Sequence, residues 1–183
     1  LHFPPKRQLG PGELFGYGAL IRWNHPQMGM VSPAQFIPIA EDSSLIVPIG
    51  DWVLHTACGQ ARRWLDRGEL SGRMAVNISH RQLKLANLVD SVRSALQHSG
   101  LPAECLELEI TESMAMDTTQ ETLDTLVRLR EMGVHLTIDD FGTGYSSLSY
   151  LRKLPIDGLK IDRSFVAGVV QEPGDAAITR AII

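Results

Sequence analysis

The stretch LTIDDFGTGYSSL, residues 136–148, sets two adjacent aspartates directly after a short apolar run. The apolar run reads as the end of a buried β-strand, and Asp139 and Asp140 follow it at once. Adjacent carboxylates repel each other and resist removal from water. A bound cation would offset that repulsion. The simpler alternative is a solvated turn in which one aspartate caps the next helix.

Short apolar runs alternate along the chain with amphipathic helical patterns. The expected strands are residues 1–3, 14–22, 74–78, 105–110, 135–138 and 158–161. The expected helices are residues 33–40, 49–67, 81–99, 119–132, 146–153 and 176–183. Regular alternation predicts an α/β fold of parallel strands joined by crossover helices. Two architectures satisfy it, an open doubly wound sheet and a closed barrel.

The ends of the expected strands favour the barrel. Four of them carry polar, chelating or cationic side chains: Asn77, Glu109, Asp139 with Asp140, and Lys160 with Asp162. A (β/α)8 barrel builds its site in this way, at the carboxyl-terminal rim of its strands. An open sheet binds mainly at one crevice and rarely needs acids from so many strands. We therefore predict a TIM-like (β/α)8 barrel.

Composition narrows the class of protein. The chain has 183 residues, 44% of them hydrophobic and 21% charged, which suits one domain with a sizeable core. The net charge of -4 argues against a general nucleic-acid or anionic-membrane binder. The sequence contains no apolar run long enough to span a bilayer. Cys58 and Cys105 are predicted to be reduced thiols of a cytosolic domain, with a disulfide between them as the alternative.

The polar residues at the strand ends are hard oxygen donors, which suit Mg²⁺ or Mn²⁺. Adjacent aspartates can serve two ions, an arrangement that fits in-line attack on a phosphodiester. Lys160, on a neighbouring strand, is a candidate for orienting water or neutralising transition-state charge. Arg22, at the end of another strand, is a candidate clamp for a phosphate oxygen.

Each of these residues also has a purely structural interpretation. Lys160 with Asp162 makes an ordinary salt bridge, Arg22 lies over the neighbouring aromatic ring, and Asn77 caps the helix that follows it. Taken singly, the structural interpretation is favoured for each. Agreement between four strands favours a polyvalent oxygen site instead.

Several long motifs in sequence order resemble the EAL domain, the bacterial family that hydrolyses cyclic di-GMP. They are GALIRWNHP (18–26), SPAQFIPIAED (32–42), VNIS (76–79), LELEITES (106–113), TIDDFGTGYSSLSYL (137–151) and LPIDGLKIDRSFV (154–166). The resemblance covers essentially the whole chain, residues 1–183, as a single EAL-like domain. It implies a modified TIM barrel and metal-assisted hydrolysis of cyclic di-GMP to linear pGpG, with two Mg²⁺ or Mn²⁺ ions.

The resemblance also implies roles for individual residues. The implied metal ligands are Asn77, Glu109, Asp139 and Asp140. The implied catalytic residues are Lys160, Asp140 and Glu112. Lys160 would contact the catalytic water, and Glu112 would support a mobile loop near residues 141–147. The implied ligand-binding residues are Arg22, Leu20 and Asp162. We expect a homodimer in the bacterial cytoplasm, alone or fused to a sensory or diguanylate-cyclase domain of a larger, membrane or sensor protein.

Three departures from the family pattern accompany this resemblance. The signature Glu-Ala-Leu reads Gly18-Ala19-Leu20 here, so a metal-binding carboxylate is replaced by hydrogen. The usual Tyr-Gln-Pro of the first strand reads Phe-Pro-Pro, with Pro4 in place of the ligand-contacting Gln. The family's last two βα units lie beyond residue 183, so we expect an incomplete barrel. These departures leave three hypotheses: a weakened or inactive phosphodiesterase, a cyclic di-GMP receptor that acts through partner contacts, and a non-functional fragment whose unpaired strands aggregate.

Overall fold

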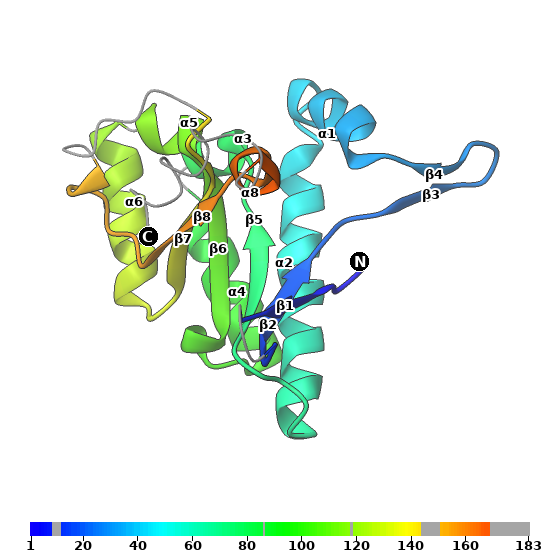
Figure 1. The fold of residues 1–183 in the computed structure, drawn as a ribbon, viewed down its shortest axis with the longest axis horizontal. Helices are drawn as coiled ribbons and strands as arrows, with labels where there is room; N and C mark the ends of the chain where they lie inside the picture. Colours follow the sequence, from blue (N-terminus) through cyan, green and yellow to red (C-terminus); the bar gives the residue numbers. More distant parts are fainter. Residues whose placement is uncertain (9–11, 86, 118, 144–150, 169–183) are drawn as a thin grey trace.

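The computed structural model describes residues 1–8, 12–85, 87–117, 119–143 and 151–168. Its main feature is a curled six-stranded sheet in the order β1-β2-β5-β6-β7-β8 (Figure 1). The strands are β1 (Pro5–Arg7), β2 (Leu14–Ala19), β5 (Arg73–Asn77), β6 (Leu106–Thr111), β7 (His135–Phe141) and β8 (Gly158–Ile161). From β2 to β8 every neighbouring pair is parallel, as the alternating pattern predicts.

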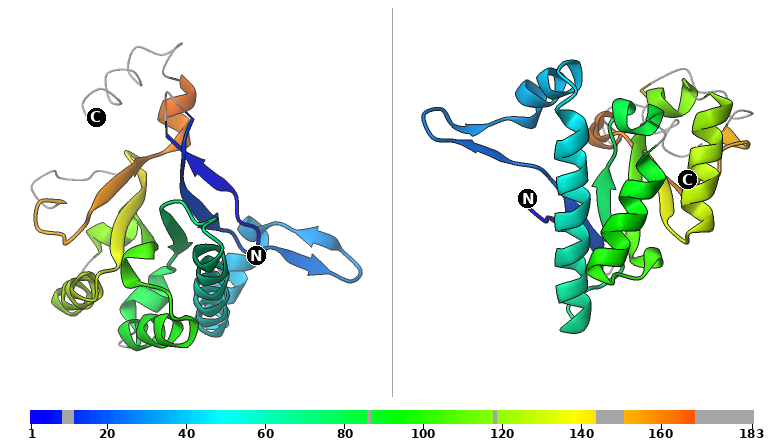
Figure 2. Two further views of the ribbon diagram at one scale, coloured as in Figure 1. Left: turned by 90° about the horizontal axis from the view of Figure 1, so that it is seen from below. Right: turned by 180° about the vertical axis from the view of Figure 1, so that it is seen from behind.

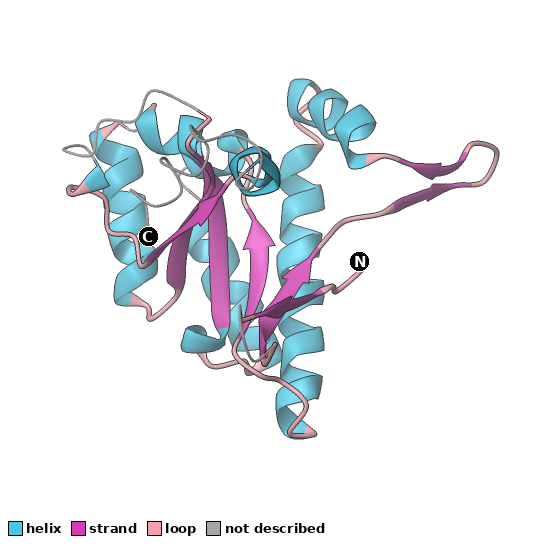
Figure 3. Cartoon of the chain, in the orientation of Figure 1, coloured by secondary structure: helices cyan, strands magenta, loops and turns pink. Residues whose placement is uncertain are grey.

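The helices are α1 (Pro33–Asp42), α2 (Ile46–Asp66), α3 (His80–Lys84), α4 (Leu88–Ser99), α5 (Glu112–Met116), α6 (Gln120–Glu131) and α8 (Arg163–Gly168), with a 3-10 turn, η1, at Ala103–Cys105. The three long helices between the parallel strands cover one face of the sheet, and α8 follows β8 on the other side (Figure 2). The long helices α2, α4 and α6 lie side by side against the convex face, and the concave face is turned away from them (Figure 2). Figure 3 shows the resulting layer of helices against strands. This is the curled part of a TIM-like barrel.

Two parts of the predicted pattern were wrong at the amino terminus. The expected strand at residues 1–3 is reduced to one bridge between His2 and Leu20, and the first strand begins at Pro5. β1 pairs antiparallel with β2 because only a short connection separates them, and a parallel pairing needs a crossover of a dozen or more residues. A separate hairpin of β3 (Trp23–His25) and β4 (Gly29–Val31) follows β2 and projects from the body (Figure 1).

The single helix expected at residues 81–99 is two helices. Ser79 starts α3 by accepting a hydrogen bond from the backbone N–H of Gln82, whose side chain returns to the Ser79 backbone. Leu85 then adopts an extended conformation, which ends α3 before α4 begins. Gly100, with a left-handed φ of 69°, ends α4. The expected helix at 176–183 and most of that at 146–153 lie outside the described residues.

The core forms between the convex face of the sheet and the helices. Alternate strand residues point to opposite faces, so one apolar set from β5, β6 and β7 faces the helices. That set is Met74, Val76, Leu106, Leu108, Ile110, Leu136 and Ile138, all almost fully buried. Helix α2 supplies Val53, Leu54, Ala57, Cys58 and Ala61 at helical spacing. Among the described helices, none has both the length and the apolar character needed to cross a lipid bilayer.

Helix α6 offers a matched test of this packing. Leu126 is fully buried, whereas its neighbour Val127 is 41% exposed. We expect Leu126→Ala to lower the free energy of unfolding by about 2–5 kcal/mol, because it leaves a cavity under the helix. Val127→Ala is expected to change it by no more than about 0.5 kcal/mol. Urea denaturation of both variants measures the difference, and equal effects would contradict the assignment of the buried face.

Candidate functional site

The concave face of the sheet carries charge where the convex face is apolar. Glu107 and Glu109 lie on β6, next to His135 and Thr137 of β7 in the parallel register. Glu107 is only 6% exposed and Glu109 only 4%. Buried carboxylates are costly unless cations or hydrogen-bond donors compensate them. The concave face must therefore supply such partners.

Two lysines from the opposite edges of the sheet supply them. Lys6 of β1 donates to Glu109 at 2.7 Å and to Glu107 at 3.1 Å. Lys160 of β8 forms an ion pair with Glu109 and lies 3.7 Å from a carboxylate oxygen of Asp139. These contacts join the two edge strands to the middle of the sheet across its concave face.

The ion pairs between these lysines and acids set the charge states of Glu109 and Lys160. Burial alone would raise the pKa of Glu109, but Lys6 and Lys160 outweigh it and hold this pKa below the ordinary value. Burial alone would lower the pKa of Lys160, but its hydrogen bond to Glu109 and the nearby acids, Glu109, Asp139 and Glu107, raise it. Glu109 is therefore a carboxylate and Lys160 an ammonium at neutral pH.

The two adjacent aspartates lie at an irregularity in the β7–β8 ladder, where the register shifts between Ile138 and Phe141. Asp140 has a left-handed φ of 55°, which non-glycine residues seldom adopt, although aspartate tolerates it better than most. The backbone N–H of Asp140 donates to its neighbour Asp139 at 3.0 Å, and the Thr143 hydroxyl donates to the Asp140 carbonyl at 2.9 Å. Such local strain is concentrated at functional sites.

The Asp140 carboxyl lies among other acids. Burial, then the charges of Asp139 and Asp162, raise its pKa above the ordinary value, and Lys160 only partly opposes them. Asp162 has its own donors, because its carboxylate accepts from the backbone N–H of Ser164 at 2.8 Å. The rim around the aspartates thus holds more negative charge than its neighbouring lysine neutralises.

Glu112 holds the start of the segment that follows β7. It is 2% exposed, and its carboxylate accepts from the backbone N–H of Gly142 at 2.8 Å. Gly142 has φ of 105°, and a Cβ there would meet the ring of Phe165 at 2.8 Å, so this position requires glycine. Glu112 and Asp140 line one hollow of about 610 Å³ at the rim.

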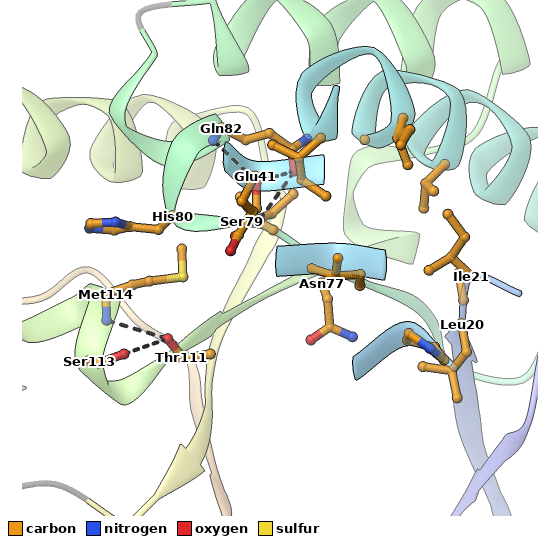
Figure 4. Close-up of a pocket in the computed structure, with 18 of the residues that line it drawn as sticks. Leu20, Ile21, Glu41, Asn77, Ser79, His80, Gln82, Thr111, Ser113 and Met114 are labelled. Carbon is orange, nitrogen blue, oxygen red and sulfur yellow. Dashed lines mark hydrogen bonds between the residues drawn. The ribbon is translucent and has the colours of Figure 1, made fainter. Parts of the chain in front are cut away.

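A larger pocket, of about 690 Å³, lies beside that hollow at the ends of β2, β5 and β6. Leu20, Arg22 and Asn77 line it, and Figure 4 shows Asn77 between Leu20 on one side and the polar wall on the other. One wall is aliphatic, from Ile21, Ile37, Ile46, Ile49 and Val53. The opposite wall is polar, from Ser79, His80, Thr111, Ser113 and Asp117. Thr111, Ser113 and Asp117 border both hollows.

The structure brings together some predicted site residues directly and others only as neighbours. Lys160 forms ion pairs with both Glu109 and Asp139, and Asn77 lies beside Glu109 in the β5–β6 register. Arg22 lines the pocket but donates to its neighbouring carbonyl, that of Ile21, at 2.8 Å.

Sequence reasoning missed two residues of this centre, Lys6 and Glu107. The alternation Leu-Glu-Leu-Glu in β6 was a signal that Glu107 shares a face with Glu109. Lys6 gave no such signal, because its strand was expected four residues earlier, at residues 1–3.

The donor set fits a hard divalent cation. Asn77, Glu109, Asp139 and Asp140 offer oxygen atoms from three neighbouring strands. Burial and then the nearby acids Asp139 and Asp162 raise the pKa of Asp140, and a bound cation would offset both effects. Within the described part of the chain, no three His, Cys, Asp or Glu side chains already converge as a metal-binding group. Lys160 lies between Glu109 and Asp139 in this arrangement.

Gly18 lies beside this donor set. It pairs with Ala75 in β5, which in turn pairs with Glu107 in β6. Residues that lie side by side in a parallel sheet point to the same face, so a side chain at Gly18 would project onto the concave face. A Cβ at this position would have no atom within 4 Å. The space for a larger side chain is therefore present.

Comparison with known proteins agrees with the resemblance. The family profile of the EAL domain matches residues 1–183. The chain is 50% identical over 183 residues to the bifunctional diguanylate cyclase/cyclic di-GMP phosphodiesterase MucR of Pseudomonas aeruginosa and 48% identical to the cyclic di-GMP phosphodiesterase NbdA of the same organism. All of this chain is covered, but only 27% and 23% of those proteins. A solved structure described as "PaMucR Phosphodiesterase, c-di-GMP complex" matches with a TM-score of 0.94 and 50% identity over 99% of this chain and 73% of that one.

Removing the ammonium group of Lys6 should show how much free energy the burial of Glu107 and Glu109 costs. We expect Lys6→Met to lower the free energy of unfolding by about 1–3 kcal/mol at pH 7, because Glu107 and Glu109 lose a charged donor. The folded pKa of Glu109 lies below its unfolded value, so this stabilisation is complete above pH ~5 and is lost as the pH falls through the folded pKa. The effect of Lys6→Met should therefore shrink in acid.

Urea denaturation in buffer with EDTA, from pH 8 down to pH 4, measures this dependence. Lys84→Met is the matched control, because Lys84 pairs with the exposed Asp117 at 2.7 Å. Such an exposed pair contributes about 0–1 kcal/mol. An equal effect of the two variants at pH 7 would show that the concave-face ion pairs do not stabilise the fold.

Proposed function

The chain belongs to the EAL domain family, and we propose that it binds cyclic di-GMP at the carboxyl-terminal rim of its sheet. We propose further that it hydrolyses one phosphodiester bond of this ligand to give pGpG, with a rate weakened by Gly18. One observation carries the proposal: Glu109, Asp139 and Lys160, from three strands, meet at that rim. The family resemblance assigns the reaction to these same residues.

The larger pocket suits the chemistry of this ligand. A purine base has flat apolar faces and polar edges, and the pocket has an aliphatic wall opposite a polar one. Its volume of about 690 Å³ falls within the ordinary range for small-molecule sites. Arg22 and Leu20 line it, and a guanidinium can hold a phosphate oxygen through two parallel hydrogen bonds. A base in this pocket would lie next to the hollow of Asp140 and Glu112.

The chain's own residues prepare the reaction in three ways. Lys160 keeps its positive charge, so it can orient a water molecule and offset charge that develops on the phosphoryl group. Asn77, Glu109, Asp139 and Asp140 would hold Mg²⁺ or Mn²⁺, whose chemistry is charge stabilisation at a phosphoryl oxygen. Glu112 accepts a hydrogen bond from the backbone N–H of Gly142 and so holds the backbone two residues after Asp140.

The second candidate function is a cyclic di-GMP receptor without turnover. Gly18 favours it, because this position on the concave face offers no carboxylate. Pro4, which stands where the family has a ligand-contacting Gln, weakens ligand contacts in both cases. The residues Asn77, Glu109, Asp139 and Lys160 are all present and favour residual hydrolysis.

The chain spans about a quarter of the curated relatives named above. We propose that it acts as one cytoplasmic, dimeric unit of a longer signalling protein with a sensory or diguanylate-cyclase part. The relative MucR is itself named as bifunctional, with both activities. Sedimentation velocity with and without cyclic di-GMP measures the dimer.

A titration separates the two functions. We expect cyclic di-GMP, added with Mg²⁺ or Mn²⁺, to bind with measurable heat and to yield pGpG slowly on chromatography. Turnover supports the enzyme, whereas binding without turnover supports the receptor. Asn77→Ala is the variant control, because it removes one donor at the rim and should abolish turnover if the rim carries the chemistry. If the unsubstituted chain gives no heat of binding and no product, both functions are excluded.

Restoring the missing carboxylate is the sharper test. We expect Gly18→Glu to raise the affinity for Mn²⁺ and the rate of pGpG formation by roughly 10–100-fold, the usual cost of losing one support of a metal site. The backbone at Gly18 admits the change, since its φ is not left-handed and a Cβ meets no atom within 4 Å.

Gly18→Gln is the matched control for this substitution. It has the same size without the charge, so it should leave both quantities near those of the unsubstituted chain. Equal behaviour of the Glu and Gln variants would place Gly18 outside the metal site.

A further inference from the structure

Two exposed histidines face each other on the convex side of the molecule, away from the candidate site on the concave face. His55 lies on α2 and His98 on α4, and these helices run side by side (Figure 2). Their ring centroids are 5.7 Å apart, with an interplanar angle of 65°. The proposed function uses neither residue.

Hydrogen bonds to backbone carbonyls favour the same tautomer in both imidazole rings. The Nδ1 of His55 lies 2.9 Å from the carbonyl oxygen of Asp51, and the Nδ1 of His98 lies 2.8 Å from that of Ser94. A carbonyl only accepts, so each Nδ1 carries the proton and each neutral ring presents a lone pair at Nε2. Histidines that bind metals use this arrangement, with the other ring nitrogen donating to a carbonyl or carboxylate.

The Nε2 atoms of His55 and His98 have few hydrogen-bond partners among the described residues. His55 Nε2 has only the hydroxyl of Ser94, at the long distance of 3.3 Å. For His98, the contacts with described residues all involve Nδ1 or the ring face. Rotation of the Ser94 hydroxyl would free the Nε2 of His55.

The spacing of the rings fits a shared ion. Zinc–nitrogen distances are about 2.0–2.1 Å, which puts the centroids of two imidazoles on one tetrahedral ion about 5 Å apart. The observed centroid distance of 5.7 Å is close to this value, and both side chains are exposed. Two neighbouring helices of the convex layer would thereby be joined.

We propose that His55 and His98 form a surface site for Zn²⁺, Ni²⁺ or Cu²⁺ that bridges α2 and α4. Imidazole ligands select these ions over Mg²⁺ and Mn²⁺, so the site is chemically distinct from the oxygen donors at the rim. In the described ranges, no third His, Cys, Asp or Glu side chain completes the group, so water fills the remaining positions. Binding at this site ties together two helices that cover the core.

Thermal unfolding and calorimetry with ZnCl₂ test the site. At a Zn²⁺ concentration of about ten times Kd, we expect the Tm to rise by about 3–6 °C and EDTA to reverse the rise. His55→Asn and His98→Asn should each lower the Zn²⁺ affinity by at least roughly tenfold. Both residues are exposed, and circular dichroism verifies that the variants fold.

His80→Asn is the matched control, because His80 and Asp117, 3.1 Å apart at the rim, are an alternative place for Zn²⁺ to bind. We expect this variant to keep the Zn²⁺ affinity of the unsubstituted chain. The proposal is overturned if Zn²⁺ affinity is unchanged in both His55→Asn and His98→Asn, or if His80→Asn alone abolishes it. MgCl₂ should produce the same Tm in the unsubstituted chain and in both pair variants.

Discussion

The arrangement of this molecule depends on one buried carboxylate, Glu109, held between Lys6 and Lys160. The two lysines come from the first and last strands of the sheet, and the glutamate from a central strand. An unpaired carboxylate at this depth would cost several kcal/mol. The curl of the sheet brings both edges close enough to compensate it. Curvature and electrostatics are therefore coupled across the concave face.

The same sheet has two faces with opposite requirements. Its convex face is continuous aliphatic surface that packs on α2, α4 and α6 and provides the stability of the fold. Its concave face concentrates carboxylates, lysines and an amide, which lower stability unless they are paired. The apolar core and the candidate site therefore lie on opposite faces of one sheet, and the ion pairs of Glu109 offset the cost of the polar face. The strained backbone at Asp140, at the end of β7, belongs to the second group.

Membership of the EAL family and turnover are separate matters in this chain. The oxygen donors on β5, β6 and β7 and Lys160 on β8 are present, whereas β2 presents Gly18 onto the same face. The absence of a carboxylate at Gly18 leaves the larger pocket and Arg22, which lines it, in place. On the proposed function, Gly18 should therefore weaken the chemical step more than the binding of the nucleotide. The histidine pair on the convex side lies outside this question, because nitrogen ligands select other ions.

The sequence alone determined the alternation of strands and helices, the parallel order of the main sheet, and the polar strand ends Asn77, Glu109, Asp139 and Lys160. These features follow from local periodicity and from the rule that parallel strands end at the same edge. The antiparallel β1, the break between α3 and α4, and the partnership of Lys6 with Glu107 and Glu109 were decided only by the tertiary structure. The reason is physical: β1 and β6 are about a hundred residues apart in the chain, and only the curl of the sheet brings their charges into contact.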